Sequence, residues 1–326
     1  ALVAKQMTGG GNVIAFDLNP LAVMAARTNY LIAIRDLIGN VDSVEIPVYL
    51  CDSILTPAEY RDLFIGAEKV AKVPCSACKP PHLLVPKEIA SNRKDIASYA
   101  HVIEKSLTLK RTPQEFVETC REESLPIKEF ALHRDLYAEL LRLDKANKNG
   151  VWARIIKNSF APLFVGEVDF VAGNPPWINW ENLPQDYREA SLDIWNKYGL
   201  REAKGAKASI GKSKHEMAAL FTYVSAEAYL KKNGRLGFVI TQSLFKNQGG
   251  AGFRAFRYNH TFLNPLSVVD MVECGVFEGA VNRTATLVIE KQKEKFQYPV
   301  RYAAWFPKSQ PHIPEELPLE EVRRRV

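Results

Sequence analysis

The chain has no long apolar run, and this absence argues against a membrane-spanning helix. No apolar stretch approaches the roughly 20 residues that such a helix needs. The first residues also lack the basic-then-apolar pattern of a secretory signal. Of the 326 residues, 47% are hydrophobic and 25% are charged, which is typical of a globular protein with an ample core. That length allows one large α/β domain or two smaller ones.

Cysteine is scarce as well. Cys75 and Cys78 form one CxxC pair, but no second CxxC or HxxxH pair follows at the spacing of a zinc site, so we expect no bound metal. An odd and scattered set of cysteines favours reduced thiols and a cytoplasmic protein. The five are Cys51, Cys75, Cys78, Cys120 and Cys274.

The net charge is +6, which is only mildly basic. It is compatible with a nucleic-acid partner, but it is equally common among enzymes that bind no nucleic acid. The function must therefore be inferred from sequence motifs and not from the net charge.

The most informative motif follows a short β-branched run at residues 168–173, which predicts a buried strand. Asn174, Pro175, Pro176 and Trp177 come directly after it, and the prolines prevent further strand pairing. Ligands bind at the carboxyl ends of strands in open α/β sheets. The Asn174 amide and the neighbouring carbonyl groups are acceptors suited to a planar amino group, and Trp177 is available to lie against a ring.

This four-residue motif resembles the catalytic motif of amino-methyltransferases that use S-adenosylmethionine, in particular the N6-adenine DNA methyltransferases. The same pattern occurs in enzymes that methylate guanine N2 in RNA or the glutamine amide of release factors. A proline-terminated strand that enters an ordinary loop is the alternative without chemistry. The resemblance implies catalytic roles for Asn174, Pro175, Pro176 and Trp177.

Two acidic residues at predicted strand ends fit the same family. Residues 12–16 form a predicted strand that ends at Asp17, and Pro20 lies near the first turn of the following helix. A carboxylate in that position accepts hydrogen bonds from ribose hydroxyls. Residues 44–51 predict the next strand, and the resemblance implies that Asp52 receives the adenine amino group of the cofactor. A surface aspartate that caps the following turn is the alternative for Asp52.

The family's glycine-rich cofactor turn, which precedes the acidic strand, is not found here. Residues 9–11 are glycines, but they lie before the second strand of the unit, and we interpret them as the end of a helix. We therefore expect a fragment that begins inside the cofactor domain and is inactive alone.

Later segments support the resemblance to large restriction–modification methyltransferases. They are FTYVSAEAYLKKNGRLGFVITQSLFK, VFEGAVNRTATLVIEK and NPPWINWENLPQDYRE. The resemblance covers most of residues 12–60 and 165–306, and it implies that Phe277 packs on the target base opposite Trp177. The alternative for Phe277 is a loop phenylalanine that covers the sheet edge. The implied partner is double-stranded DNA with a flipped adenine, with a specificity or nuclease component elsewhere. A degenerate DNA-binding module is the non-enzymatic alternative.

A basic segment follows the motif at residues 201–214 and is suited to phosphate contacts. A solvated loop is the alternative. Its lysines are Lys204, Lys207, Lys212 and Lys214.

The predicted fold is a doubly wound, mostly parallel, Rossmann-like α/β sheet with an antiparallel last strand and a helical insertion. The expected parts are a partial cofactor half (1–60), the insertion (61–164), the catalytic half (165–306) and a C-terminal region or linker (307–326).

Local signals predict three helices and three further strands. Thr112 and Pro113 form a helix start, residues 127–148 have amphipathic spacing, and Ser213 with Glu216 has the form of a capping box for a helix that ends at 233–234. The predicted strands are 236–241, 266–272 and 284–289.

Overall fold

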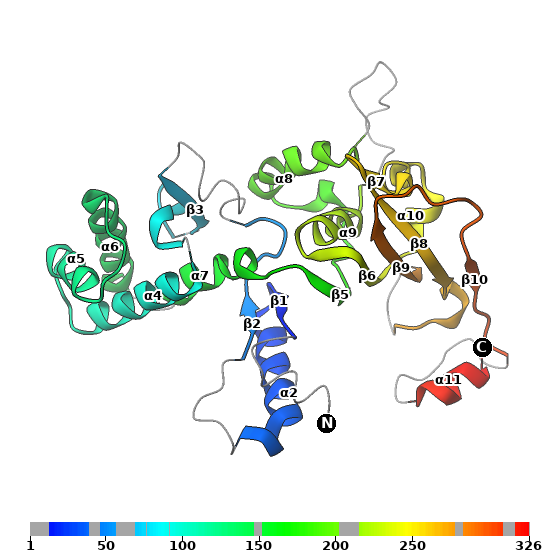
Figure 1. The fold of residues 1–326 in the computed structure, drawn as a ribbon, viewed down its shortest axis with the longest axis horizontal. Helices are drawn as coiled ribbons and strands as arrows, with labels where there is room; N and C mark the ends of the chain where they lie inside the picture. The colour runs from blue at the N-terminus through cyan, green and yellow to red at the C-terminus, as the bar shows by residue number, and fades with distance from the viewer. Residues whose placement is uncertain are drawn as a thin grey trace. The chain divides into compact units, whose positions relative to one another are not determined.

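The computed structural model describes residues 13–38, 46–56, 69–75, 77–90, 92–146, 152–201, 215–277, 283–308 and 317–325. These residues belong to two compact units, 1–165 and 166–326, and each unit is described by itself. Figure 1 shows their helices and strands. Within the described ranges, no helix combines the length and the apolarity needed to cross a bilayer.

The first unit begins with the predicted strand–helix–strand segment. It consists of β1 (Ala15–Asp17), α2 (Pro20–Ile38) and β2 (Val48–Leu50), and the two strands pair in parallel. Pro20 occupies the first position of α2, where its missing N–H costs nothing. One face of the helix packs on the strands through buried apolar side chains. They are Val23, Tyr30 and Ile34 of the helix and Val48 of β2.

The predicted insertion contains the expected helices and also a hairpin. Its strands β3 (Val70–Pro74) and β4 (His82–Pro86) pair antiparallel. Prolines around the turn conceal the alternation of buried Ala71 and Val73 with outward side chains, so the sequence predicted a helical insertion without this hairpin. The remaining elements are η1 (Lys87–Ala90), α4 (Arg93–Thr108), α5 (Pro113–Glu122), α6 (Phe130–Lys145), α7 (Trp152–Ser159) and η2 (Ala161–Phe164).

The insertion has a hydrophobic core of its own. Side chains from the hairpin and from all four helices contribute to one buried cluster, separate from the cluster around α2. The predicted helix start is confirmed, because Thr112 and Glu115 form a complete capping box with Pro113 inside the first turn. The predicted helix over 127–148 forms as the shorter α6.

The prediction that all cysteines are reduced thiols is wrong for one pair. Cys75 and Cys78 form a disulfide at the turn of the β3–β4 hairpin, with Cα atoms 5.4 Å apart. The hairpin reverses the chain there and brings the two side chains within bonding distance. The other three cysteines are free and buried.

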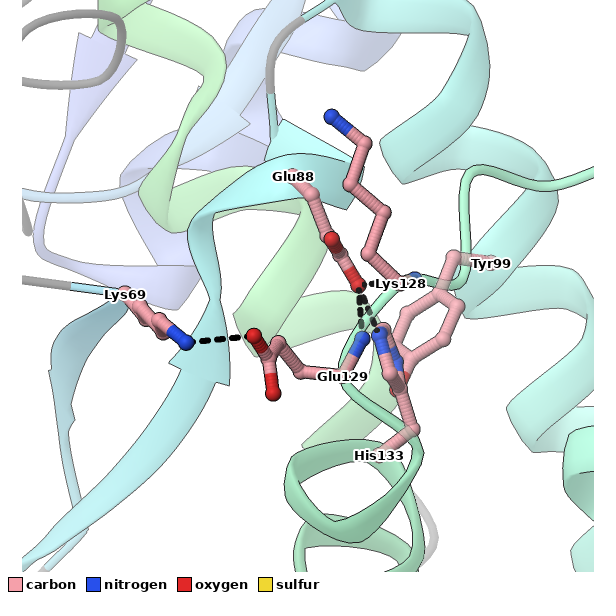
Figure 2. Close-up of polar contacts among 6 residues, drawn as sticks. All are labelled: Lys69, Glu88, Tyr99, Lys128, Glu129 and His133. Atoms are coloured by element: carbon pink, nitrogen blue, oxygen red, sulfur yellow. Dashed lines mark hydrogen bonds and ion pairs between the residues drawn. The ribbon is translucent and has the colours of Figure 1, made fainter.

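A buried polar network ties the hairpin side of the insertion to α6 (Figure 2). Glu88 Oε1 accepts hydrogen bonds from His133 Nε2 at 2.7 Å and from the backbone N–H groups of Lys128 and Glu129 at 2.8 and 3.2 Å. The Tyr99 hydroxyl lies 2.9 Å from His133 Nδ1. Burial lowers the pKa of His133, so its neutral ring accepts from Tyr99 and donates to Glu88.

The second unit is built on a mixed sheet in the order β10-β8-β9-β6-β5, with β7 paired to β8 (Figure 1). β5 pairs in parallel with β6, whereas β9 is antiparallel to both β6 and β8. The α/β class is therefore confirmed, and β9, which contains the last predicted strand (284–289), is antiparallel as expected. The strands are β5 (Val168–Gly173), β6 (Leu230–Thr241), β7 (Arg257–Tyr258), β8 (Thr261–Asp270), β9 (Thr284–Gln292) and β10 (Tyr302–Ala304).

The helix α9 packs against β6 and completes the core of this unit. Buried side chains from both elements and from the neighbouring strands meet there, among them Leu220, Tyr223, Leu236, Ile240 and Leu287. The helical elements of the unit are η3 (Trp180–Asn182), α8 (Gln185–Lys197), α9 (Met217–Ala228), α10 (Ser243–Lys246), η4 (Gln248–Gly250), η5 (Phe253–Ala255), η6 (Val272–Cys274) and α11 (Leu319–Arg325).

Two local predictions for α9 are wrong. The helix ends at Ala228 rather than at 233–234, because Leu230 already pairs with Val168 of β5, and residues 231–234 form an irregular stretch of β6 before pairing resumes at Arg235. Glu216 is the N-cap residue and not the third helical residue of a capping box, because its carboxylate bonds to side chains on and after β6. Ser213 lies outside the described residues.

The prediction that residues 168–173 form a buried strand is only partly correct. The strand forms, but in the described residues it pairs on one side only, with β6, and Phe170 is 75% exposed. A strand at the edge of a sheet keeps one row of backbone groups unpaired.

Candidate functional site

The Asn-Pro-Pro-Trp motif lies at the carboxyl end of β5, as predicted. Gly173 is the last residue of the strand and pairs with Phe238 of β6. Asn174 is exposed, and its side chain makes no hydrogen bond to any residue that the structure describes, whereas Pro175 is buried. The motif therefore presents an amide to solvent on a backbone that two prolines restrain.

Trp177 is fixed in orientation by the neighbouring strand. Its indole Nε1–H donates to the backbone oxygen of Val239 on β6, at 3.2 Å. Its ring meets Phe277 edge to face, with the ring centroids 5.4 Å apart and the planes at 77°. The two aromatic residues that the sequence placed around a target base are thus neighbours. They contact each other directly, so a base enters between them only if the rings separate.

The chain beyond the motif is tied to the start of α9. The Met217 N–H donates to the Ile178 oxygen at 2.9 Å, and the Trp180 N–H donates to the His215 oxygen at 2.7 Å. Asn179 and Glu216 form an antiparallel bridge between these pairs. The motif is therefore held from both β6 and α9.

Glu216 adds a buried polar connection that sequence reasoning missed. Its carboxylate accepts hydrogen bonds from the hydroxyls of Thr241, at the end of β6, and Ser243, at the start of α10. The residue is 9% exposed. The predicted capping box drew attention to Glu216 but gave it the wrong partners, since both hydroxyls lie more than twenty residues further along the chain.

Asp270 is a second buried acid that sequence reasoning missed. It ends β8, is 7% exposed, and accepts hydrogen bonds from the side chains of Gln242 and Tyr302. Burial raises the pKa of Asp270, but these bonds, the Val272 amide and Lys246 outweigh burial and lower it below its ordinary value. The one signal in the sequence was a charged residue inside the apolar run 266–272.

The two predicted cofactor residues lie in the first unit, at the same edge of a parallel strand pair. Asp17 ends β1 and pairs with Leu50, and Asp52 follows β2 by two residues. Asp17 Oδ1 accepts from the Asn19 N–H at 2.7 Å. Asp52 Oδ1 accepts from the N–H groups of Ile54 and Leu55 at 2.8 and 2.9 Å, so it also caps the following turn.

The four predicted phosphate-binding lysines, Lys204, Lys207, Lys212 and Lys214, lie outside the described residues. The residues on either side of them are described. The Arg201 guanidinium lies over the Trp180 ring, 4.4 Å from its centroid, and His215 Nδ1 is 2.8 Å from the Glu181 carboxylate. Both flanking residues therefore contact the turn η3, which begins three residues after Trp177.

The sequence matches one protein family over most of its length. The model of the Eco57I restriction-modification methylase family matches residues 11–277. The strand end, its Asn-Pro-Pro-Trp motif and the α/β fold define the chain as methyltransferase-like, and the family match makes this specific. The chain belongs to the Eco57I restriction-modification methylase family. The match includes residues 61–164, which the motif resemblance did not cover.

Solved structures give weaker likenesses. A candidate class I S-adenosylmethionine-dependent methyltransferase from Listeria monocytogenes is 18% identical, with a TM-score of 0.32 over 48% of this chain and 47% of that one. The M protein of the type I restriction enzyme EcoKI is 16% identical, with a TM-score of 0.24 over 39% and 21%. The DNA-bound type ISP restriction-modification enzyme LlaBIII is 10% identical, with a TM-score of 0.39 over 93% and 16%.

The chain spans less than half the length of each of these three proteins. A search of curated protein sequences gives no match. The assignment therefore rests on the family match and on the chain's own residues.

Proposed function

We propose that these residues belong to a DNA methyltransferase that transfers a methyl group from S-adenosylmethionine to the N6 amine of a flipped adenine, within a restriction–modification or related defence system. The observation that carries the proposal is the Asn-Pro-Pro-Trp motif at the carboxyl end of β5, in a chain of a restriction-modification methylase family.

Asn174 and Pro175 supply acceptors for the amine. An adenine N6 amine is a poor nucleophile because its lone pair is delocalised into the ring. If the Asn174 side-chain oxygen and the Pro175 carbonyl both accept from the amino hydrogens, they stabilise the positive charge that develops on nitrogen and orient the lone pair. A neutral amide suffices because the nucleophile is neutral.

The cofactor supplies the electrophilic methyl group when it is bound. Asp17 and Asp52 fit its nucleoside, since two carboxylates at one edge of a parallel pair are acceptors for ribose hydroxyls and for an exocyclic amino group. Only one oxygen of Asp17 is used by the Asn19 amide.

The target base has to leave the duplex before it reaches Asn174, because its amine is inaccessible inside the stack. Unstacking costs a few kcal/mol, and stacking on an aromatic ring returns ~1–3 kcal/mol per base. Trp177 and Phe277 together roughly offset the cost once their rings separate around the base. The lysines of residues 202–214 would contact backbone phosphates.

The test uses the full-length protein. Host DNA is mapped for N6-methyladenine with and without the gene, and the site found is used for single-turnover methylation. Asn174→Ala should lower the transfer rate by ~10²–10³ with little change in DNA or cofactor affinity, because its hydrogen bonds strengthen as charge develops. The matched control is Asn196→Ala, an exposed asparagine on α8.

Methylated guanine in RNA or methylated glutamine, with unmodified DNA, would replace the adenine assignment by one of the related amine methyltransferases. DNA binding without methylation of any of these substrates would favour a binding module. An unchanged single-turnover rate in Asn174→Ala would remove this residue from the mechanism.

A further inference from the structure

We propose that Asp270 is a positioning residue for the target-base pocket, and that it acts by anchoring the turn that carries Phe277. The inference rests on the proposed function, because it takes Phe277 as one wall of the pocket. It adds a residue to which no role in the site has so far been given.

Asp270 binds the start of the turn directly. Its Oδ1 accepts a hydrogen bond from the Val272 N–H at 3.1 Å, and Val272 is the first residue of η6. The turn ends in Gly275, whose φ of 54° lies in the left-handed region that favours glycine. Phe277 follows two residues later, so few backbone dihedrals separate the anchored turn from the aromatic ring.

The other oxygen of Asp270 connects the turn to the strand that holds Trp177. Oδ2 accepts from the Gln242 side chain, and Gln242 directly follows β6. Val239, three residues earlier, is the acceptor for the Trp177 indole. One carboxylate therefore connects the turn that carries Phe277 to the strand that holds Trp177, which agrees with the distance of 5.4 Å between the two ring centroids.

A third connection runs to β10. The Tyr302 hydroxyl donates to Asp270 Oδ2 at 2.6 Å, and the Trp305 N–H donates to the Asp270 backbone oxygen at 2.9 Å. The Lys246 ammonium lies 3.7 Å from the same carboxylate. Several donors around a nearly buried acid hold it as an anion, and hydrogen bonds to a charged group are the stronger kind.

The chemistry explains why an acid is required here. A carboxylate has acceptor sites on both oxygens and no donor. An amide at this position would direct an N–H₂ group at donors, either at Val272 N or at Gln242 and Tyr302. Asp270→Asn is therefore expected to release the turn while it preserves the size of the side chain.

The experiment combines hydrogen exchange with single-turnover methylation in the full-length protein. Asp270→Asn should increase amide exchange over residues 271–277 and lower the transfer rate roughly tenfold, the scale of one hydrogen bond to a charged group. Affinity for S-adenosylmethionine should not change. Tyr302→Phe removes one donor only and should shift both readouts less, in the same direction. The matched control, Asp169→Asn, changes an acid on β5 that is paired with Lys231.

A double-mutant cycle between Asp270 and Phe277 separates a positioning role of Asp270 from a general loss of stability. If Asp270 acts through Phe277, adding Asp270→Asn to Phe277→Ala should cause no further loss of rate. Unchanged exchange over residues 271–277 in both Asp270→Asn and Tyr302→Phe would overturn the inference, as would fully additive rate losses. Faster exchange combined with a Phe277→Ala variant of normal rate would uphold the anchoring of the turn and contradict the role of Phe277 in the proposed function.

Discussion

Trp177 offers the sharpest perturbation, because the structure assigns it two separable interactions. The indole N–H bonds to Val239 O, and the ring meets Phe277 edge to face. Trp177→Phe removes the first and keeps an aromatic ring. Trp177→Ala removes both.

The magnitudes differ enough to be distinguished. A net intramolecular hydrogen bond contributes ~0.5–1.5 kcal/mol, so the activity of Trp177→Phe should fall by at most about tenfold, through a less restrained ring. Loss of base stacking costs ~1–3 kcal/mol, or about one to two decades in rate or affinity, so Trp177→Ala should be clearly worse. It also loses the edge-to-face contact with Phe277, which contributes ~0.5–1.5 kcal/mol.

The assay places 2-aminopurine at the target position and follows its fluorescence together with single-turnover methylation and thermal unfolding. If Trp177 stacks on the base, the fluorescence of the Ala variant should fall in parallel with its activity while its melting temperature changes little. A large drop in melting temperature that tracks the loss of activity would identify a core anchor instead. Equal activity in both variants at similar melting temperatures would refute the stacking role.

Three further outcomes are expected. Burial lowers the pKa of His133, whereas burial raises the pKa of Glu88 but its hydrogen bonds outweigh burial and lower it. The free energy of unfolding should therefore fall as pH drops below about 6.5, where His133 takes up a proton in the unfolded chain first, and fall further below about 4.3 for the same reason at Glu88. Urea titrations at several pH values check this, and the slope is at most about 1.4 kcal/mol per pH unit for each group. Thr112→Ala should cost about 1 kcal/mol by urea titration, whereas Thr112→Ser should cost much less. Calorimetry on the full-length protein should give roughly tenfold weaker cofactor binding for Asp17→Asn and unchanged binding for Asp36→Asn, an exposed acid on α2.

Local chemistry made part of this structure predictable from the sequence. Pro20 and Thr112 mark helix starts through backbone effects that need no partner elsewhere in the chain. The prolines after Gly173 likewise end β5 by removing backbone donors. The β3–β4 hairpin was missed because prolines at its turn outweighed the alternation of its buried residues.

The connections between the pocket elements were not predictable, because they depend on contacts between distant residues. The segment Lys231–Gly234 has the composition of a helix end, yet it lies within β6, because Leu230 before it pairs with Val168 and Arg235 after it pairs with Phe170. Asp270 has its main side-chain partners 28 and 32 residues away, at Gln242 and Tyr302. A motif can name the groups that touch a substrate, but the acids that hold those groups become visible only once the strands are paired. For this chain that difference separates Asn174, which the motif names, from Asp270, which only the folded sheet connects to Phe277.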